Sequence, residues 1–154
     1  MLGPMAGVVH DSLQHLRPGD ARAMAAYLRD RPRREVARED AWRRPPPERI
    51  EPMMKAGRRL YGRHCVDCHG EDGRGDPGVV ALAGNRSVTQ RNPTNVVRMI
   101  RAGGFPASTP GNPYPHGMPP FPQLSDPQIA ALATYIRHSW GNDATAVSTI
   151  GMPE

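Results

Sequence analysis

The segment Cys65-Val66-Asp67-Cys68-His69 contains both cysteines of this 154-residue chain. Two thiols separated by two residues and followed directly by an imidazole suit four chemistries. These are a structural zinc site, a redox-active dithiol, a structural disulfide and the covalent attachment of haem. The rest of the sequence has to discriminate among them.

Three of the four chemistries find little support elsewhere in the chain. A structural zinc site needs a second ligand pair roughly 12 to 20 residues away, but the next histidine after His69 is His116. A redox dithiol follows a β-strand, and no β-branched run precedes Cys65. A disulfide across two residues forms only with strain. The pattern therefore favours haem, with thioethers to Cys65 and Cys68 and the His69 imidazole on the iron.

The composition indicates a chain with many loops and little apolar material of its own. Only 38% of its residues are hydrophobic and 5% aromatic, while it contains 16 glycines and 18 prolines. A bound group that adds apolar area would help so small a core to fold. The formal net charge of +5 suits an anionic partner, although the excess of arginine over lysine fits a codon bias equally well.

A helix is predicted immediately before the cysteines. It is expected to open at Glu51 and Pro52, because an acidic residue and a proline suit a first helical turn. Gly57, Tyr61 and Cys65 then recur every four residues and share one face. Since a glycine in a helix costs about 0.5–1 kcal/mol relative to alanine, we expect Gly57 to permit a close crossing with another helix.

The crossing partner is expected near the C-terminus. Ser125 as N-cap and Gln128 form a capping-box pattern, and Gly141 is expected to end the helix as its C′ residue. An apolar stripe with helical spacing lies between them, flanked by Tyr135: Ile129, Leu132, Ala133 and Ile136. The two predicted helices indicate an all-α core.

A proline-rich segment, Phe105 to Pro122, is placed to supply a second axial ligand. Its seven prolines restrict the backbone and lower the entropy of the loop. His116 and Met118 lie at its centre. A thioether ligand favours reduced iron and raises the potential, whereas a second histidine gives a lower one. On the residues alone, both remain candidates.

The segments GRRLYGRHCVDCHGEDGRG, LAGN and HGMPPFPQLSDPQIAALATYIRHSWGN, in this order, resemble a class I cytochrome c. They are most similar to the last haem domain of the multihaem cytochrome subunits of bacterial membrane-bound alcohol, sugar and gluconate dehydrogenases, over about Pro52 to Ser148. The resemblance implies an all-α fold around one covalent haem c, with His69 and Met118 as axial ligands. It also implies a haem pocket that includes Tyr61, Leu82, Phe121, Leu132 and Tyr135.

One stretch departs from the family pattern. Relatives usually have two prolines before the segment that matches LAGN, and a backbone carbonyl there accepts the proton of the axial imidazole. Here Val80 and Ala81 take those places. A carbonyl is retained, but the loop loses stiffness that would help to orient His69.

The first 31 residues contain a partial internal repeat. Residues 16–29 match residues 124–137, 108 positions later, at Leu16/Leu124, Ala23/Ala131, Ala25/Ala133, Tyr27/Tyr135 and Arg29/Arg137. Met5 stands where an axial methionine would, but no CxxCH precedes it. We interpret residues 1–31 as the C-terminal fragment of a preceding cytochrome c domain, packed poorly as one helix, with Met5 ligating nothing. The alternative is a chance similarity between amphipathic helices.

This interpretation divides the chain into four parts. Residues 32–51 are an Arg/Pro-rich linker, 52–148 the haem domain and 149–154 a tail. The chain would then be a piece of a longer multihaem subunit. A location on the periplasmic side of the bacterial inner membrane is expected, although the chain begins without the basic and apolar regions of a secretion signal and has no segment apolar enough for a membrane span.

The resemblance implies single-electron transfer rather than catalysis. Electrons would pass from a membrane-associated dehydrogenase towards quinone or a respiratory acceptor. The expected partners are the dehydrogenase catalytic subunit, the acceptor and other haem domains, with no nucleic acid. Two alternatives remain: a five-coordinate haem protein that binds gases or reduces peroxide, and a zinc or dithiol binding module.

Overall fold

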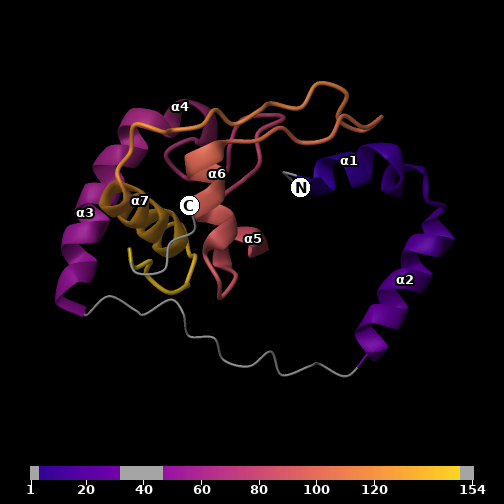
Figure 1. The fold of residues 1–154 in the computed structure, drawn as a ribbon, viewed down its shortest axis with the longest axis horizontal. Helices are drawn as coiled ribbons and strands as arrows, with labels where there is room; N and C mark the ends of the chain where they lie inside the picture. Colours follow the sequence, from indigo (N-terminus) through magenta and orange to yellow (C-terminus); the bar gives the residue numbers. More distant parts are fainter. Residues whose placement is uncertain (1–3, 32–46, 150–154) are drawn as a thin grey trace.

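The computed structural model describes residues 4–31 and 47–149, and their regular structure is helical (Figure 1). Isolated bridges, Gly104 with Met118 and Thr109 with Asn112, are the only extended pairings within these ranges. The elements in chain order are α1 (Pro4–Asp11), the 3-10 turn η1 (Leu13–His15), α2 (Pro18–Asp30), α3 (Pro47–His64), α4 (Val66–His69), α5 (Arg86–Thr89), α6 (Thr94–Ala102) and α7 (Asp126–His138). The predicted all-α class is confirmed.

The core is built on the crossing of α3 and α7, which lie against each other in Figure 1. A Cβ atom on Gly57 would overlap the Ala131 carbonyl and lie 2.5 Å from the Cβ of Tyr135. Tyr61 and Cys65, one and two turns after Gly57, are both buried. Gly57 therefore has the role predicted for it.

The apolar stripe predicted on α7 is buried from more than one side. Ile129, Leu132, Ala133 and Ile136 all belong to the core, and α6 contributes Val96, Val97 and Ile100. Full burial of a large aliphatic side chain is worth about 1.5–3 kcal/mol. Burial of these side chains is therefore a main source of stability for the fold.

The predicted start of α3 is wrong. The helix begins at Pro47, with Glu48 in its first turn, and Pro52 lies inside it. Pro47 lies in the first turn, where a backbone N–H has no partner within the helix. Pro52 has no N–H to donate, so one carbonyl of the first turn lacks its helical partner. Residues 47–51 thus belong to α3 rather than to the predicted linker. The remainder of that linker, 32–46, and the tail from residue 150 lie outside the described residues.

The predicted start of α7 is confirmed, but its predicted end is wrong. Ser125 donates its backbone N–H to Oε1 of Gln128 at 2.8 Å, completing the capping box. The helix stops at His138 with Ser139 as C-cap. Trp140 follows in the left-handed region with φ of 56°, and Gly141 has φ of 81°. The left-handed backbone expected at Gly141 therefore begins one residue earlier, at Trp140.

Arg137, in the last turn of α7, is completely buried and joins three segments. Its guanidinium donates to the carbonyls of Val88, Gln90 and Thr145 at 2.6, 2.8 and 3.0 Å. Burial lowers the pKa of this group from its ordinary value. The three carbonyls replace the water that the guanidinium loses, so the charge can be accommodated inside the fold.

The N-terminal helices are separate from this core. Residues 4–31 form two α-helices and a 3-10 turn rather than the single helix expected, and α2 packs against no other helix of the described ranges (Figure 1). A contact reaches the proline-rich loop, where His10 Nδ1 lies 3.2 Å from the Ser108 carbonyl. Met5 is exposed. None of the described helices is long and apolar enough to cross a membrane.

Replacing Gly57 with alanine should lower the free energy of unfolding by about 1–3 kcal/mol, because the new methyl group has to push α3 away from α7. The matched control is Gly62→Ala in the same helix, since no atom lies within 4 Å of a Cβ at Gly62. That variant should raise the stability by about 0.5–1 kcal/mol. Denaturant unfolding compares the two. Equal effects would contradict the proposed crossing.

Candidate functional site

The two cysteines lie where α3 passes into the short helix α4. Cys65 is the N-cap of α4, and its carbonyl accepts the backbone N–H of His69 at 2.9 Å. Both thiols are free, with Cys65 buried and Cys68 exposed. Burial, followed by the neighbouring Cys68, raises the pKa of the Cys65 thiol to about 12, so it stays protonated at neutral pH. The pair is available for covalent attachment of a ligand.

His69 follows the cysteines with its ring orientation defined by a hydrogen bond. Its Nδ1 lies 3.2 Å from the carbonyl oxygen of Val80. Because a carbonyl can only accept, Nδ1 carries the proton and Nε2 keeps its lone pair for a metal. Burial lowers the pKa of the imidazole, against the opposing effect of this hydrogen bond, and favours the neutral form. The valine at position 80 thus retains the carbonyl acceptor that the resemblance implied.

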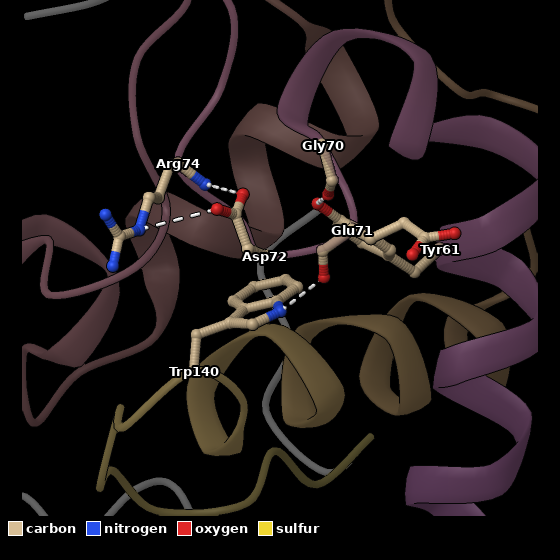
Figure 2. Close-up of polar contacts among 6 residues, drawn as sticks. All are labelled: Tyr61, Gly70, Glu71, Asp72, Arg74 and Trp140. Carbon is tan, nitrogen blue, oxygen red and sulfur yellow. Dashed lines mark hydrogen bonds and ion pairs between the residues drawn. The ribbon is translucent and has the colours of Figure 1, made fainter.

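Two aromatic side chains hold the backbone that follows His69 (Figure 2). The Tyr61 hydroxyl donates to the Gly70 carbonyl at 2.6 Å, and Trp140 Nε1 donates to the Glu71 carbonyl at 2.7 Å. Burial raises the pKa of Tyr61 above its ordinary value, so the hydroxyl remains a donor. One bond comes from α3 and the other from the end of α7, so both helices of the crossing position this loop.

The same side chains form an aromatic cluster, which consists of Tyr61, Tyr135 and Trp140. Ring centroids lie 5.4 Å apart for Tyr61 and Tyr135, 5.0 Å for Tyr61 and Trp140, and 5.7 Å for Tyr135 and Trp140. A Cβ on Gly73 would lie 2.5 Å from the Trp140 ring. The cluster therefore fills the space between the helix crossing and the loop after His69.

Met118 is attached to the end of α6 through its backbone. Gly104 and Met118 exchange two N–H to carbonyl bonds of 2.9 Å. Gly103 has φ of 65°, and a Cβ there would overlap the Met118 carbonyl and lie 2.8 Å from the Pro120 nitrogen. The Met118 side chain is half-buried against the core. Close backbone contacts at Gly103 and Gly104 therefore hold the loop that carries Met118 in place, in addition to the prolines of that loop.

The competing ligand candidate, His116, is exposed and lies beside Gly78. A Cβ on Gly78 would be 2.8 Å from Nδ1 of His116. His116 therefore lies next to the loop that carries Val80, whereas Met118 packs against the core.

The predicted pocket residues fall into two groups. Leu82 and Phe121 are half-buried against the core, and Leu132 is fully buried. Tyr61 and Tyr135 lie in the aromatic cluster. Contact of these five side chains with a haem stays a prediction.

Sequence reasoning missed three contributors to the site. These are Trp140, which holds the Glu71 carbonyl, and Gly103 and Gly104, which hold the methionine loop. The adjacent glycines Gly103 and Gly104 were the available signal for the loop, whereas Trp140 had none beyond its position after α7.

The residues present fit a covalently bound haem. In residues 47–149 the large apolar side chains that remain exposed are Val80, Phe105 and Tyr114. Val80 accepts from His69, and the ring of Phe105 lies against Gly117, next to Met118. Two cysteines without a disulfide, a His69 Nε2 with its lone pair available and exposed apolar side chains thus lie on the segments that carry the expected ligands. Among the described residues no three His, Cys, Asp or Glu side chains are arranged to hold a metal ion, so a zinc module has no ligand set there.

Tyr61→Phe should remove the bond to the Gly70 carbonyl and lower the free energy of unfolding by about 0.5–1.5 kcal/mol. The backbone N–H of Gly75 donates to the His69 carbonyl at 2.9 Å, so its hydrogen exchange should become faster as the loop loosens. Tyr114→Phe is the matched control, because Tyr114 is exposed. A Gly75 amide that exchanges alike in both variants would show that Tyr61 does not hold the loop.

The chain is similar to cytochromes c over most of its length. A family model described as cytochrome c matches residues 54–140. The chain is 32% identical over 155 residues to the alcohol dehydrogenase (quinone) cytochrome c subunit of Gluconobacter oxydans, covering 94% of this chain and 31% of that protein. It is 29% identical over 158 residues to the gluconate 2-dehydrogenase cytochrome c subunit of Pantoea cypripedii, covering 96% and 35%. It is 30% identical over 170 residues to the fructose dehydrogenase cytochrome subunit of Gluconobacter japonicus, covering 95% and 34%.

The chain therefore spans about a third of the length of these relatives. The family match includes the attachment motif, the methionine loop and most of both crossing helices. Together with the observed fold, it establishes that the chain belongs to the cytochrome c family, which implies covalently bound haem c as its cofactor.

Proposed function

We propose that this protein transfers single electrons through one haem c that is held by Cys65 and Cys68 and ligated by His69 and Met118. The observation that carries the proposal is the hydrogen bond from His69 Nδ1 to the Val80 carbonyl. It leaves Nε2 as a metal ligand directly after two free cysteines. Electron transfer is also the function that family membership supports.

Each of these residues would have a distinct task. When bound, haem c supplies an iron that takes up and releases one electron. Cys65 and Cys68 would prevent its dissociation, and Val80 would keep the His69 imidazole oriented and in one tautomer. The Met118 thioether, a soft ligand, would stabilise the reduced state and raise the potential. With both axial positions filled by the protein, no position would remain for a substrate.

The identity of the relatives suggests the partners. Since they are cytochrome subunits of alcohol, gluconate and fructose dehydrogenases, we propose that a dehydrogenase catalytic subunit donates the electrons. Quinone or another respiratory acceptor would receive them. The complex would face the periplasm at the inner membrane, with membrane contact through partner subunits or through segments outside this sequence.

Met118→Ala should abolish the weak far-red absorption band of methionine-ligated ferric haem c and lower the reduction potential, because a soft ligand of the reduced state is lost. His116→Ala is the matched control from the same loop and should leave both properties nearly unchanged. Absorption spectroscopy and a redox titration of the haem-loaded protein measure them. The reverse outcome would indicate bis-histidine ligation. If neither variant changes the absorption band or the reduction potential, the haem has only one protein ligand.

Cys65→Ala and Cys68→Ala should each leave a haem held by one thioether, since each thiol forms one bond. The double variant should release its haem on denaturation. Extraction with acidified acetone, followed by mass spectrometry of the polypeptide, separates covalent from dissociable haem. Haem that remains on the denatured double variant would overturn the attachment site.

A further inference from the structure

Asn142 is a buried asparagine whose side chain joins the end of α7 to residues 80–85, called here the acceptor loop. Only 6% of its surface is exposed. Its Nδ2 donates to the carbonyls of Ile136, near the end of α7, and of Leu82, at 2.9 and 3.1 Å. Its Oδ1 accepts the backbone N–H of Gly84 at 2.9 Å. The amide nitrogen and oxygen therefore both have partners, and two of the three partners lie in the acceptor loop.

A second asparagine, Asn85, holds the acceptor loop from within. Its Nδ2 donates to the Ala81 carbonyl at 2.8 Å, and its Oδ1 accepts the backbone N–H of Ser87 at 2.8 Å as the N-cap of α5. The carbonyls at positions 80, 81 and 82 thus accept hydrogen bonds from three different side chains, and the first of these is the imidazole of His69.

An uncommon backbone conformation brings Asn142 to this loop. Trp140 and Gly141 both have positive φ, at 56 and 81°, and the backbone N–H of Asn142 then donates to the Ser139 carbonyl at 2.9 Å. A bulky residue keeps a positive φ only where the surrounding contacts hold it there. The hydrogen bonds of the Asn142 side chain are such contacts.

The acceptor loop needs external support because it lacks backbone restraints of its own at the critical positions. Val80 and Ala81 stand where relatives usually have two prolines, whose rings would restrict the backbone. Within the described part of the chain, neither the Val80 N–H nor the Ala81 N–H donates a hydrogen bond. A proline at either position would therefore break no hydrogen bond.

From these observations we infer that Asn142 and Asn85 are positioning residues for the axial imidazole, and that their side chains take over the role of the missing proline pair. The inference rests on the proposed ligation of the iron by His69. Both asparagines act through the Val80 carbonyl, which accepts the Nδ1 proton of His69.

The hydrogen bond to the Val80 carbonyl has a definite effect on the iron. It raises the basicity of the imidazole as a ligand, and a more basic ligand stabilises the oxidised iron. A loosened acceptor loop should therefore raise the reduction potential and expose the Nδ1 proton of His69 to solvent.

The test uses the full chain with its haem bound and compares Asn142→Ala with the unchanged protein. The Nδ1 proton of His69, followed by NMR in the reduced state, should exchange with solvent at least about tenfold faster in the variant. A redox titration should give a higher potential.

Ser139→Ala is the matched control, because the Ser139 hydroxyl donates to the Tyr135 carbonyl of α7 at 2.7 Å. Like Asn142→Ala, it removes a side-chain bond to a carbonyl near the end of α7, but it leaves the acceptor loop intact. Both the exchange rate and the potential should stay as in the unchanged protein.

Two further variants separate positioning from a general loss of stability. Adding Val80→Pro and Ala81→Pro to Asn142→Ala should restore slow exchange and the original potential. Asn85→Asp keeps an N-cap oxygen for α5, but its ionised carboxylate cannot donate to the Ala81 carbonyl. This second variant, which alters a less buried site, should also speed the exchange of the Nδ1 proton and raise the potential.

The inference is overturned if Asn142→Ala and Asn85→Asp both leave the exchange rate and the potential unchanged. It is also overturned if Ser139→Ala has the same effect as Asn142→Ala, or if the proline pair restores neither property. The ring current of a haem shifts the ring protons of an axial imidazole strongly upfield. If the unchanged protein lacks this shift at His69, the proposed ligation fails and the inference fails with it, whereas an unchanged exchange rate at a shifted His69 refutes the inference alone.

Discussion

The close contact between Gly57 of α3 and the Ala131 carbonyl of α7 is the constraint on which the rest of this cytochrome domain depends. It brings two helices, far apart in the sequence, close enough to bury the apolar side of α7. The same crossing also positions the site. The chain passes from the end of α3 directly into Cys65, while the end of α7 places Trp140 against the Glu71 carbonyl. Changes at the crossing should therefore affect both the stability of the fold and the geometry around His69, because the same two helices supply both.

The segments that carry the expected iron ligands have little regular structure, and backbone hydrogen bonds hold them instead. On the histidine side, the Leu82 N–H donates to the Gly73 carbonyl at 2.7 Å, and His69 itself bonds the Val80 carbonyl. On the methionine side, Gly104 pairs with Met118. Loops of this kind need glycines where backbones approach closely and prolines where chain entropy must be limited, which accounts for the abundance of both residues. A covalent cofactor would then add apolar area that so loop-rich a chain lacks.

Local and periodic patterns made much of this arrangement predictable. The capping box at Ser125, the shared face of Gly57 and Tyr61, and the helix that leads into the cysteines all depend on residues a few positions apart. The contacts that could not be predicted from the sequence have a different cause. The Trp140 indole is bound to a backbone carbonyl 69 positions away, and Arg137 to carbonyls 47 and 49 positions away. Every residue has a carbonyl, so such partners leave no signature in the sequence. The start of α3 is not predictable from the sequence, because a proline fits both a linker and a first helical turn.

A spectroelectrochemical titration of the haem-loaded protein, combined with exposure of the reduced form to carbon monoxide, tests the central claim most directly. A haem with both axial positions filled by His69 and Met118 should follow a one-electron Nernst curve, with a slope of about 59 mV per decade. Its reduced spectrum should not change when carbon monoxide is added, because no position on the iron is open. Immediate formation of a carbon monoxide adduct would contradict the account, since it would show an iron that binds ligands rather than one that only exchanges electrons.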